Sequence, residues 1–306
     1  MIKFIYLSLL TTIILLLFAC QPNDDENQIS VMVPFGSTQL AQLYLEADPF
    51  YDVDVVSGPD LLISAFSAQT HDVIIAPMNL GAKLYHNHTA YQCLAVIVWG
   101  NFYIVSHKEV FHNVEDLDGK TITMFGQNQT ADIILSFIIE AYDIEITRVY
   151  VDSLMTAQAM LISDQADIIL TAEPSLSVLS QSLDLISTLD LQEVYQDITQ
   201  TSSYPQAGVF VHKRLSPALI ETLSIDLKAS IDGVNQDPES AALLAIQLGI
   251  DLEVNILVQA IYNSHLNYVS AQLAKDAIED FFDIILSINP NLIGQMKPHE
   301  SFYMTP

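Results

Sequence analysis

The stretch EDLDGKTITMFGQNQTADIILSFIIEA, residues 115–141, contains the unit from which we predict the fold. A short apolar run over 121–125 predicts a β-strand, and the polar residues 126–130 predict a turn after it. Ile134 and Ile138 then recur at the spacing of one helical face. Strand, turn and helix in this order indicate an α/β architecture.

The same unit recurs on both sides of this stretch. Further strands are predicted at 29–33, 52–56, 73–76, 94–98, 148–151, 167–170 and 207–211. Ser216-Pro217 and Asp237-Pro238 are typical helix starts, since each places a capping residue before a proline. A last helix is indicated by the apolar stripe Ala274, Ala277, Ile278, Phe281, Phe282 and Ile285.

Two turn segments of the sequence divide the chain into two predicted lobes. The first lies at Trp99-Gly100-Asn101, and the second lies near Tyr204-Pro205-Gln206. We therefore expect residues 29–99 and 204–306 to form lobe 1 and residues 100–203 to form lobe 2.

The N-terminus has the order of a secretory signal. Lys3 precedes an apolar run over 4–18, and a small residue, Ala19, precedes Cys20. Leu-Phe-Ala-Cys, which ends at Cys20, resembles the bacterial lipobox, whose cysteine is lipidated. We predict a signal peptide over 1–19, lipidation of Cys20, and a flexible acidic tether over 20–28.

This N-terminal segment has two other interpretations. Its apolar run approaches the ~18–20 residues of a transmembrane anchor, and an ordinary secretory signal would make Cys20 incidental. All three interpretations place the folded part outside the cytoplasm, and the lipobox places it on the extracytoplasmic face of the cell membrane.

The charge balance makes nucleic acid an unlikely class of partner. The chain has 37 acidic and 10 basic side chains, and its formal net charge is −27. Such a field repels phosphate backbones. Most of these carboxylates are expected to form a solvated surface.

Neither the cysteines nor the histidines predict a metal or disulfide site. Cys20 is assigned to lipid, and Cys93 lies in an apolar stretch and is expected to fill the core. The histidines considered as metal ligands are five of the eight in the chain, His71, His86, His88, His107 and His112. His86-Asn87-His88 lacks a carboxylate at helical spacing, so we expect no zinc.

Three segments together resemble a known family. Glu115-Asp116-Leu117-Asp118-Gly119-Lys120 before a strand resembles the opening of the second lobe in periplasmic-binding-protein-like domains. The run 165–169 before Glu173-Pro174, and the helix start over 234–241, are also similar to motifs of that family. The resemblance covers residues 29–288, and its specificity lies in the order of the motifs.

Within that family, Asp72 to Gly81 resembles the branch that binds nitrate, sulfonates, taurine and thiamine precursors. The glycine usual before Asp167 is Ala166 here, and a cysteine-rich iron motif is lacking. The resemblance implies an α/β, two-lobed type II fold with a central cleft and hinge crossovers. It also implies a substrate-binding lipoprotein of an ABC importer, a monomer without cofactor that binds a small molecule and meets permease and ATPase subunits.

The site is expected where strands end. In open α/β sheets the crevice lies beyond the carboxyl ends of the strands, where helix N-termini present free backbone N–H groups. The predicted ligand-binding residues are Phe35, Gly36, Ser37, Thr38, Pro77, Met78, Asn79, Trp99, Asn101, Gly126, Gln127, Asn128, Thr130, Glu173 and Tyr204.

Several of these residues have an equally simple structural interpretation. The aromatic side chains are as often packing residues, and Asn79 is as often a helix cap. Gln127 and Asn128 are typical of exposed turns, and Glu173-Pro174 turns of this family often have a structural role.

The predicted turns contain no Lys or Arg, although recognised anions usually meet such a cation. This favours a neutral or weakly basic heterocycle, such as a thiamine precursor or a flavin. A sulfonate or taurine stays open because helix N-termini alone can hold anions.

Two other functions stay open. One is an enzyme on the same fold, similar to menaquinone-pathway dehydratases or thiamine-pyrimidine synthases, although no Ser-His-Asp, Cys-His or paired-carboxylate arrangement stands out. The other is a sensor or adhesive lipoprotein without transport. The sequence predicts a binding protein and no catalytic residues.

Overall fold

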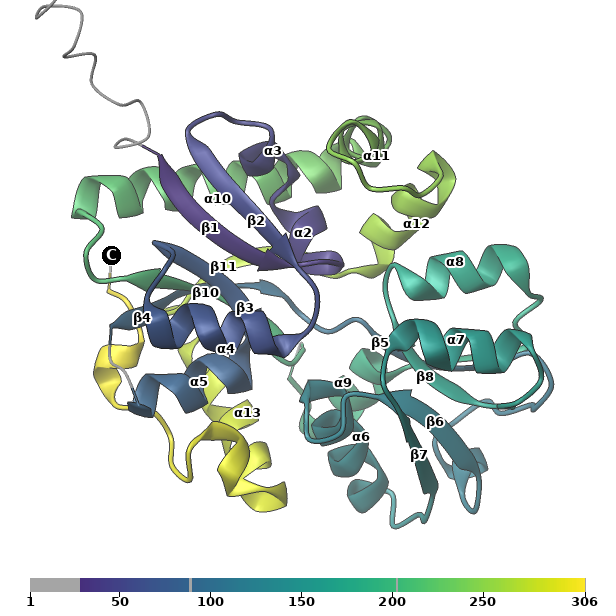
Figure 1. Ribbon diagram of the computed structural model, residues 1–306. Helices are drawn as coiled ribbons and strands as arrows, with labels where there is room; N and C mark the ends of the chain where they lie inside the picture. Colours follow the sequence, from purple (N-terminus) through teal and green to yellow (C-terminus); the bar gives the residue numbers. More distant parts are fainter. Residues whose placement is uncertain (1–27, 88–89, 202, 306) are drawn as a thin grey trace, which may run out of the picture.

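The computed structural model describes residues 28–87, 90–201 and 203–305. The predicted signal peptide, Cys20 and the tether up to residue 27 lie outside the described residues. The described chain forms two lobes, each built on its own sheet (Figure 1). This confirms the predicted two-lobed α/β fold. Among the described helices, none is both long and apolar enough to cross a bilayer.

Lobe 1 is built on a six-stranded sheet with the order β11-β4-β10-β3-β1-β2. Its strands are β1 (Ile29–Pro34), β2 (Tyr51–Val56), β3 (Val73–Pro77), β4 (Tyr91–Val98), β10 (Ala207–His212) and β11 (Leu266–Ser270). β1 pairs in parallel with β2 and β3, whereas β10 lies antiparallel between β3 and β4. The late strand β10 therefore joins the two halves of this sheet.

The helices of lobe 1 come from both ends of the chain. They are α2 (Ser37–Ala41), α3 (Leu43–Glu46), α4 (Pro59–Ala68), α5 (Met78–Asn87), α10 (Pro217–Gln236), α11 (Pro238–Gln247), α12 (Val254–Asn263) and α13 (Lys275–Ile288), with 3₁₀ turns η3 (Pro290–Ile293) and η4 (Glu300–Phe302). Figure 1 shows α10 on one side of the sheet and α4 and α5 on the other.

Lobe 2 is built on a five-stranded sheet with the order β7-β6-β8-β5-β9. Its strands are β5 (Phe102–Ser106), β6 (Thr121–Phe125), β7 (Thr147–Val151), β8 (Ile169–Ala172) and β9 (Ser187–Asp190). Its helices are α6 (Thr130–Ala141), α7 (Leu154–Ile162), α8 (Ser175–Ser182) and α9 (Leu191–Thr199), with the 3₁₀ turn η2 (Glu115–Leu117). β5 pairs antiparallel with β8 and β9.

Two segments connect the lobes. Residues 99–101 lead from β4 into β5, and residues 200–206 lead from α9 back to β10. The two crossovers lie side by side, because Gln206 N donates to Val98 O at 3.0 Å and Ser203 Oγ donates to Trp99 O.

Most predicted elements are present, with strand ends within a few residues of the predicted positions. The strands β5, β9 and β11 were not predicted. β9 and β11 pair only on one side, and they contain polar or exposed residues that give no apolar run. Their strand geometry depends on neighbours that are distant in sequence.

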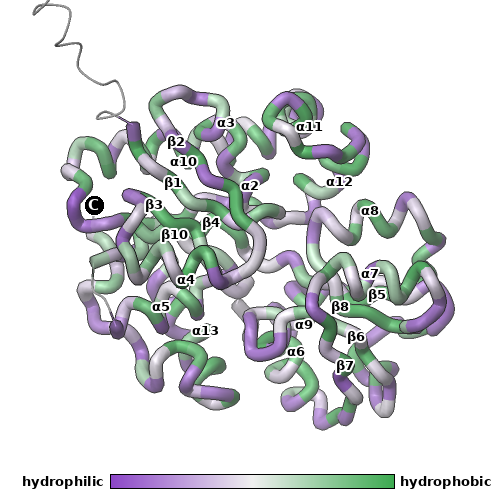
Figure 2. The backbone as a smooth tube through the Cα atoms, in the orientation of Figure 1, coloured by the Kyte–Doolittle hydropathy of each residue, from purple (hydrophilic) through white to green (hydrophobic). Residues whose placement is uncertain are grey.

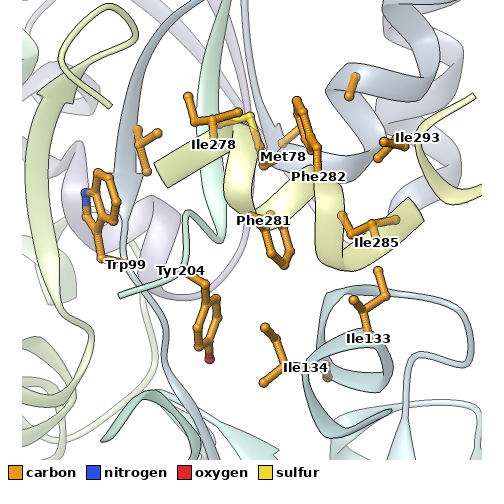
Figure 3. Close-up of a cluster of buried hydrophobic side chains, with 14 of the residues drawn as sticks. Met78, Trp99, Ile133, Ile134, Tyr204, Ile278, Phe281, Phe282, Ile285 and Ile293 are labelled. Atoms are coloured by element: carbon orange, nitrogen blue, oxygen red, sulfur yellow. The ribbon is translucent and has the colours of Figure 1, made fainter. Parts of the chain in front are cut away.

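The apolar side chains form three buried clusters. Figure 2 shows hydrophobic stretches of the chain in both lobes. One cluster lies only in lobe 1 around α10 and α12, and another lies only in lobe 2 around α7 and α8. The largest cluster includes residues of both lobes. It crosses from one lobe to the other where α13 meets α6, as shown in Figure 3.

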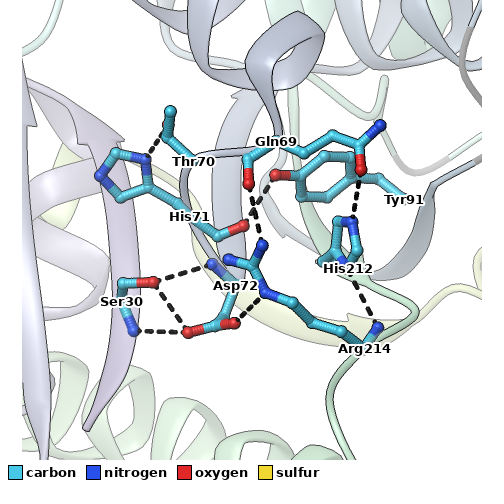
Figure 4. A network of polar contacts seen from close by, with 8 residues as sticks. All are labelled: Ser30, Gln69, Thr70, His71, Asp72, Tyr91, His212 and Arg214. Atoms are coloured by element: carbon cyan, nitrogen blue, oxygen red, sulfur yellow. Dashed lines mark hydrogen bonds and ion pairs between the residues drawn. The ribbon is translucent and has the colours of Figure 1, made fainter. Parts of the chain in front are cut away.

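The end of lobe 1 away from its β1–α2 turn is held by a polar network (Figure 4). Asp72 accepts hydrogen bonds from Ser30 N and Ser30 Oγ, and its other oxygen lies 2.6 Å from Arg214 Nε. Burial alone would raise the pKa of Asp72, but the bonds from Arg214 and Ser30 outweigh it and hold this pKa below its usual value. The network joins the beginnings of β1 and β3 to the end of β10.

Gly81 of α5 allows a close approach of helix and sheet. A Cβ atom at this position would lie 2.0 Å from Cζ of the Phe210 ring on β10. Phe210 is fully buried, so the ring has little room to move.

We predict that Gly81→Ala lowers the free energy of unfolding by about 1–3 kcal/mol, because the overlap with Phe210 exceeds the gain in helix propensity. Urea denaturation gives this value. Phe210→Leu removes the overlapping ring atoms, so the double variant is expected to be more stable than the sum of the two single changes indicates. Strict additivity would contradict the proposed overlap.

Candidate ligand-binding cleft

A cavity of about 190 Å³ lies between the two lobes, at the carboxyl ends of their parallel strands. Both lobes and both crossovers contribute to its wall. Its lining residues are Pro34, Phe35, Gly36, Ser37, Thr38, Pro77, Val98, Asn101, Phe102, Phe125, Gly126, Gln129, Thr130, Ala131, Leu154, Leu170, Ala172, Glu173, Gln206 and Ala207.

The lobe 1 wall is the turn between β1 and α2. Gly36 has a φ of 115°, a conformation that favours glycine, and a Cβ here would lie 3.8 Å from Glu173 O in lobe 2. Ser37 Oγ receives a hydrogen bond from Asn101 Nδ2 at 2.6 Å and lies 2.8 Å from Ser264 Oγ. The turn is therefore held against the crossover and against the end of α12.

The floor of the cavity is formed by the crossovers. Phe102 lines the cavity, and its other face stacks on Tyr204 with ring centroids 6.3 Å apart and an interplanar angle of 9°. Tyr204 is fully buried beneath it, against Tyr195 and Phe281. Phe102 is thus an aromatic wall whose orientation is fixed by a buried ring.

The lobe 2 wall includes the N-terminus of α6 at Gly126 and Thr130. The first N–H groups of a helix lack intrahelical acceptors, so this end can donate to a bound group. Thr130 Oγ1 itself donates to Asn79 Oδ1 across the cleft at 3.2 Å. Lobe 2 therefore offers backbone donors, while its threonine hydroxyl is engaged.

Glu173 is the charged residue of the cavity wall and is only 3% exposed. Its Oε1 accepts from Asn263 Nδ2 at 2.7 Å and from Ser177 Oγ at 3.0 Å, and its Oε2 accepts from Ser177 N. Burial raises the pKa of Glu173, and the bonds from Asn263 and Ser177 offset only part of this effect. Glu173 caps α8 and also joins lobe 2 to lobe 1.

Two amide side chains of the wall have an acceptor without a partner in the described part of the chain. They are the buried Oδ1 of Asn101 and Oε1 of Gln206. Asn101 is 3% exposed. Because a buried polar atom without a partner is unfavourable, these oxygens favour a bound group that carries hydrogen-bond donors.

The structure brings nine predicted residues to the cavity: Phe35, Gly36, Ser37, Thr38, Pro77, Asn101, Gly126, Thr130 and Glu173. They come from five turns that are far apart in sequence. Phe35 is 52% exposed and stands at the rim.

The other predicted residues do not line this cavity. Met78 and Tyr204 belong to the buried core, and Trp99 donates its Nε1–H to Asn267 O in a different pocket, behind the crossover. Asn79 lies behind the cavity wall and accepts a hydrogen bond from the lining residue Thr130. Gln127 and Asn128 belong to the turn before α6, where Asn128 N donates to Asp132.

Sequence reasoning missed Phe102, Gln129, Leu154 and Gln206. Phe102 stands next to Asn101, which was singled out, and Gln206 belongs to the motif Tyr204-Pro205-Gln206 but was not predicted to bind ligand. Successive side chains of a strand point to opposite faces of the sheet. The turn motifs do not determine which of two neighbouring residues points toward the cleft.

No group of three or more His, Cys, Asp or Glu within residues 28–87, 90–201 and 203–305 is arranged to hold a metal ion. Cys93 is fully buried, and burial raises the pKa of its thiol far above the usual value.

No protein-family model matches the chain, and no curated protein matches it in sequence. Solved structures match its fold. One, an ABC transporter from Parabacteroides distasonis, has a TM-score of 0.80 and 21% sequence identity, covering 91% of this chain and 99% of that one.

Two further solved structures agree over nearly the same length. The ligand binding component of an ABC-type import system from Staphylococcus aureus, with zinc bound, has a TM-score of 0.69 at 13% identity and covers 92% of this chain and 97% of that one. The periplasmic aliphatic sulphonate binding protein SsuA from Escherichia coli has a TM-score of 0.66 at 13% identity and covers 92% and 94%. At the level of the fold, the predicted resemblance is confirmed.

The raised pKa of Glu173 predicts a specific pH dependence of stability. The folded protein holds this proton more tightly than the unfolded chain, so ionisation of Glu173 destabilises the fold. Relative to Glu173→Gln, the wild type is expected to be most stable below pH about 4.5 and to lose stability as the pH rises through the folded-state pKa. Chemical denaturation at several pH values measures this difference.

The exposed Glu193 on α9 provides the matched control, Glu193→Gln. A difference between wild type and Glu173→Gln that is independent of pH between about 4 and 8 would contradict the raised pKa.

Proposed function

We propose that this chain is the extracytoplasmic ligand-binding component of an ABC-type import system, which captures a small organic molecule and delivers it to a permease. The observation that carries this proposal is the cavity between the two lobes. Its wall comes from both lobes and includes Asn101 and Gln206, each with a buried side-chain oxygen that has no partner in the described part of the chain. Solved proteins with this fold are described as ligand-binding components of import systems. A ligand that touches both lobes stabilises the closed form.

The wall chemistry supports a neutral or weakly basic ligand that carries N–H or O–H donors. Glu173 and the free oxygens of Asn101 and Gln206 are acceptors, and no Lys or Arg is among the residues that line the described cavity. A sulfonate would bring negative charge close to the Glu173 carboxylate. Only backbone groups, such as the start of α6, would oppose that repulsion.

The size of the cavity supports a small ligand. Its volume of about 190 Å³ is below the roughly 300–1,000 Å³ that is usual for drug-sized molecules. Phe102 lines this space and its ring is stacked on Tyr204, so an aromatic side chain is available to a ligand with a single ring. Among the predicted heterocycles, a pyrimidine such as a thiamine precursor therefore fits this closed cleft better than a flavin does.

The cavity wall supports binding more than catalysis. Glu173 is its one ionisable side chain among the described residues, and both of its oxygens are occupied by Ser177 and Asn263. A proton-transfer reaction usually needs a group within reach of the substrate, with a partner that tunes it. Glu173 lines the cleft, but its carboxylate is bonded to the neutral donors Ser177 and Asn263, and no second ionisable side chain of the described residues lines the cleft as its partner.

The proposal includes the predicted anchor and lobe boundaries. A lipid on Cys20 would hold the protein at the extracytoplasmic face of the membrane, and residues 20–28 would act as the tether. Residues 29–99 and 204–306 would move as lobe 1, and residues 100–203 would move as lobe 2.

Thermal-shift measurement tests the ligand class. We expect pyrimidines and related single-ring heterocycles to raise the melting temperature, whereas taurine, alkanesulfonates and nitrate leave it unchanged. A ligand at 100 times its Kd adds about 2.7 kcal/mol of stability, which is easily detected. Mass spectrometry of the co-purified small molecule identifies the natural ligand.

Asn101→Ala is expected to abolish the shift, whereas Gln196→Ala on the exposed face of α9 is expected to keep it. Stabilisation by sulfonates alone would refute the ligand class. Turnover of the bound compound, or unchanged uptake in reconstituted vesicles when this protein is omitted, would refute the import role.

A further inference from the structure

The two flanks of the cleft are built differently. On one flank α13 of lobe 1 packs on α6 of lobe 2, and on the other flank α12 of lobe 1 meets α8 of lobe 2. Figure 1 shows these two contacts on opposite sides of the crossovers. The two contacts differ in whether an apolar core is shared between the lobes.

The α6–α13 contact is a shared apolar core. Phe281 and Ile285 of α13 face Ile134 and Ile133 of α6 in Figure 3, and all four side chains are at most 1% exposed. They belong to the single cluster that runs through both lobes and includes the crossover residue Tyr204. Separation of the lobes here would expose these side chains to water, which is unfavourable in proportion to the apolar area exposed.

The α8–α12 contact joins two cores that stay separate. Leu176 and Leu179 of α8 belong to the apolar cluster of lobe 2, whereas Leu257 and Ile261 of α12 belong to that of lobe 1. Polar groups cross this flank. When the lobes separate, a hydrogen bond between them is replaced by hydrogen bonds to water. Breaking such a bond therefore changes the free energy much less than exposing a shared apolar core does.

Asn263 stands at the centre of this polar flank. Its Nδ2 donates to Glu173 Oε1 at 2.7 Å, and its backbone oxygen accepts from Tyr103 Oη at 2.9 Å. Asn263 is the last residue of α12, so these two bonds hold the end of a lobe 1 helix against β5 and β8 of lobe 2. The side-chain amide thus reaches the carboxylate that forms part of the cavity wall.

We propose that the lobes turn about the buried α6–α13 contact, and that Asn263 is the positioning residue that holds the cleft closed by binding Glu173. The cleft opens on the α8–α12 side, and the α6–α13 side stays packed. This inference rests on the proposed function, since it assigns the motion by which a ligand enters. It names a residue that need not touch the ligand.

Distances between paired spin labels test the proposal in the ligand-free, full-length chain. Cys20→Ser removes the predicted lipidation site, and Cys93 is fully buried, so introduced thiols are labelled selectively. One pair, Gln181→Cys with Asn255→Cys, spans α8 and α12, and the other, Glu140→Cys with Ser287→Cys, spans α6 and α13. All four positions are exposed.

We expect the α8–α12 distances to include a longer, open population and the α6–α13 distances to remain single and short. Asn263→Ala is expected to increase the ratio of open to closed molecules about fivefold, the factor for loss of one net hydrogen bond. Asn263→Asp is expected to increase it further, because a second carboxylate would face Glu173. Asn235→Ala is the matched control, since its amide donates to Leu266 O within lobe 1.

Two results would overturn the proposal: equal lengthening on both flanks, or identical α8–α12 distances in Asn263→Ala and Asn235→Ala. Circular dichroism of each variant shows that it is folded before distances are compared. Because these measurements need no ligand, their outcome is separate from that of the compound panel. A protein that opens on one flank but binds no tested compound would keep the pivot and refute the proposed ligand class.

Discussion

The insertion of β10 between β3 and β4 is the constraint on which the cleft depends. Because β10 pairs antiparallel with both β3 and β4, the start of β10 lies beside the ends of β3 and β4. The chain must therefore leave lobe 1 at Val98 and return to it at Ala207 in adjacent places. The two crossovers become one hinge, whose residues Asn101, Phe102 and Gln206 form the floor of the cavity.

The apolar core extends from this hinge in an asymmetric way. Tyr204 lies beneath Phe102 and contacts Tyr195 of lobe 2 and Phe281 of lobe 1, so the hinge and the α6–α13 contact form one packed unit. The β1–α2 turn on the other wall is held by the hydroxyl of Ser37 and by Asn101. Tight packing thus fixes the floor, while directional bonds of modest strength fix the walls.

The surface of this protein and its cavity wall differ in their charged groups. The formal net charge of −27 reflects carboxylates that mostly face solvent, and many of the few cations already pair with them, as Arg214 does with Asp72. In the cavity wall the charge and the hydrogen-bonding capacity depend on a few single side chains. Glu173 stays buried because three hydrogen bonds surround it, and the unpartnered oxygens of Asn101 and Gln206 add to its acceptor character.

The sequence by itself determined the α/β class, the two lobes and the turns at which strands end, because strand and helix periodicity and capping residues are local signals. It also led to nine residues of the cavity wall, such as Gly36 and Thr130. The tertiary structure alone decided that Phe102 rather than Trp99 faces the cleft, that Tyr204 is buried, and that Asn263 meets Glu173. These outcomes depend on the phase of each strand and on contacts between residues as far apart as 90 positions, which no local pattern encodes.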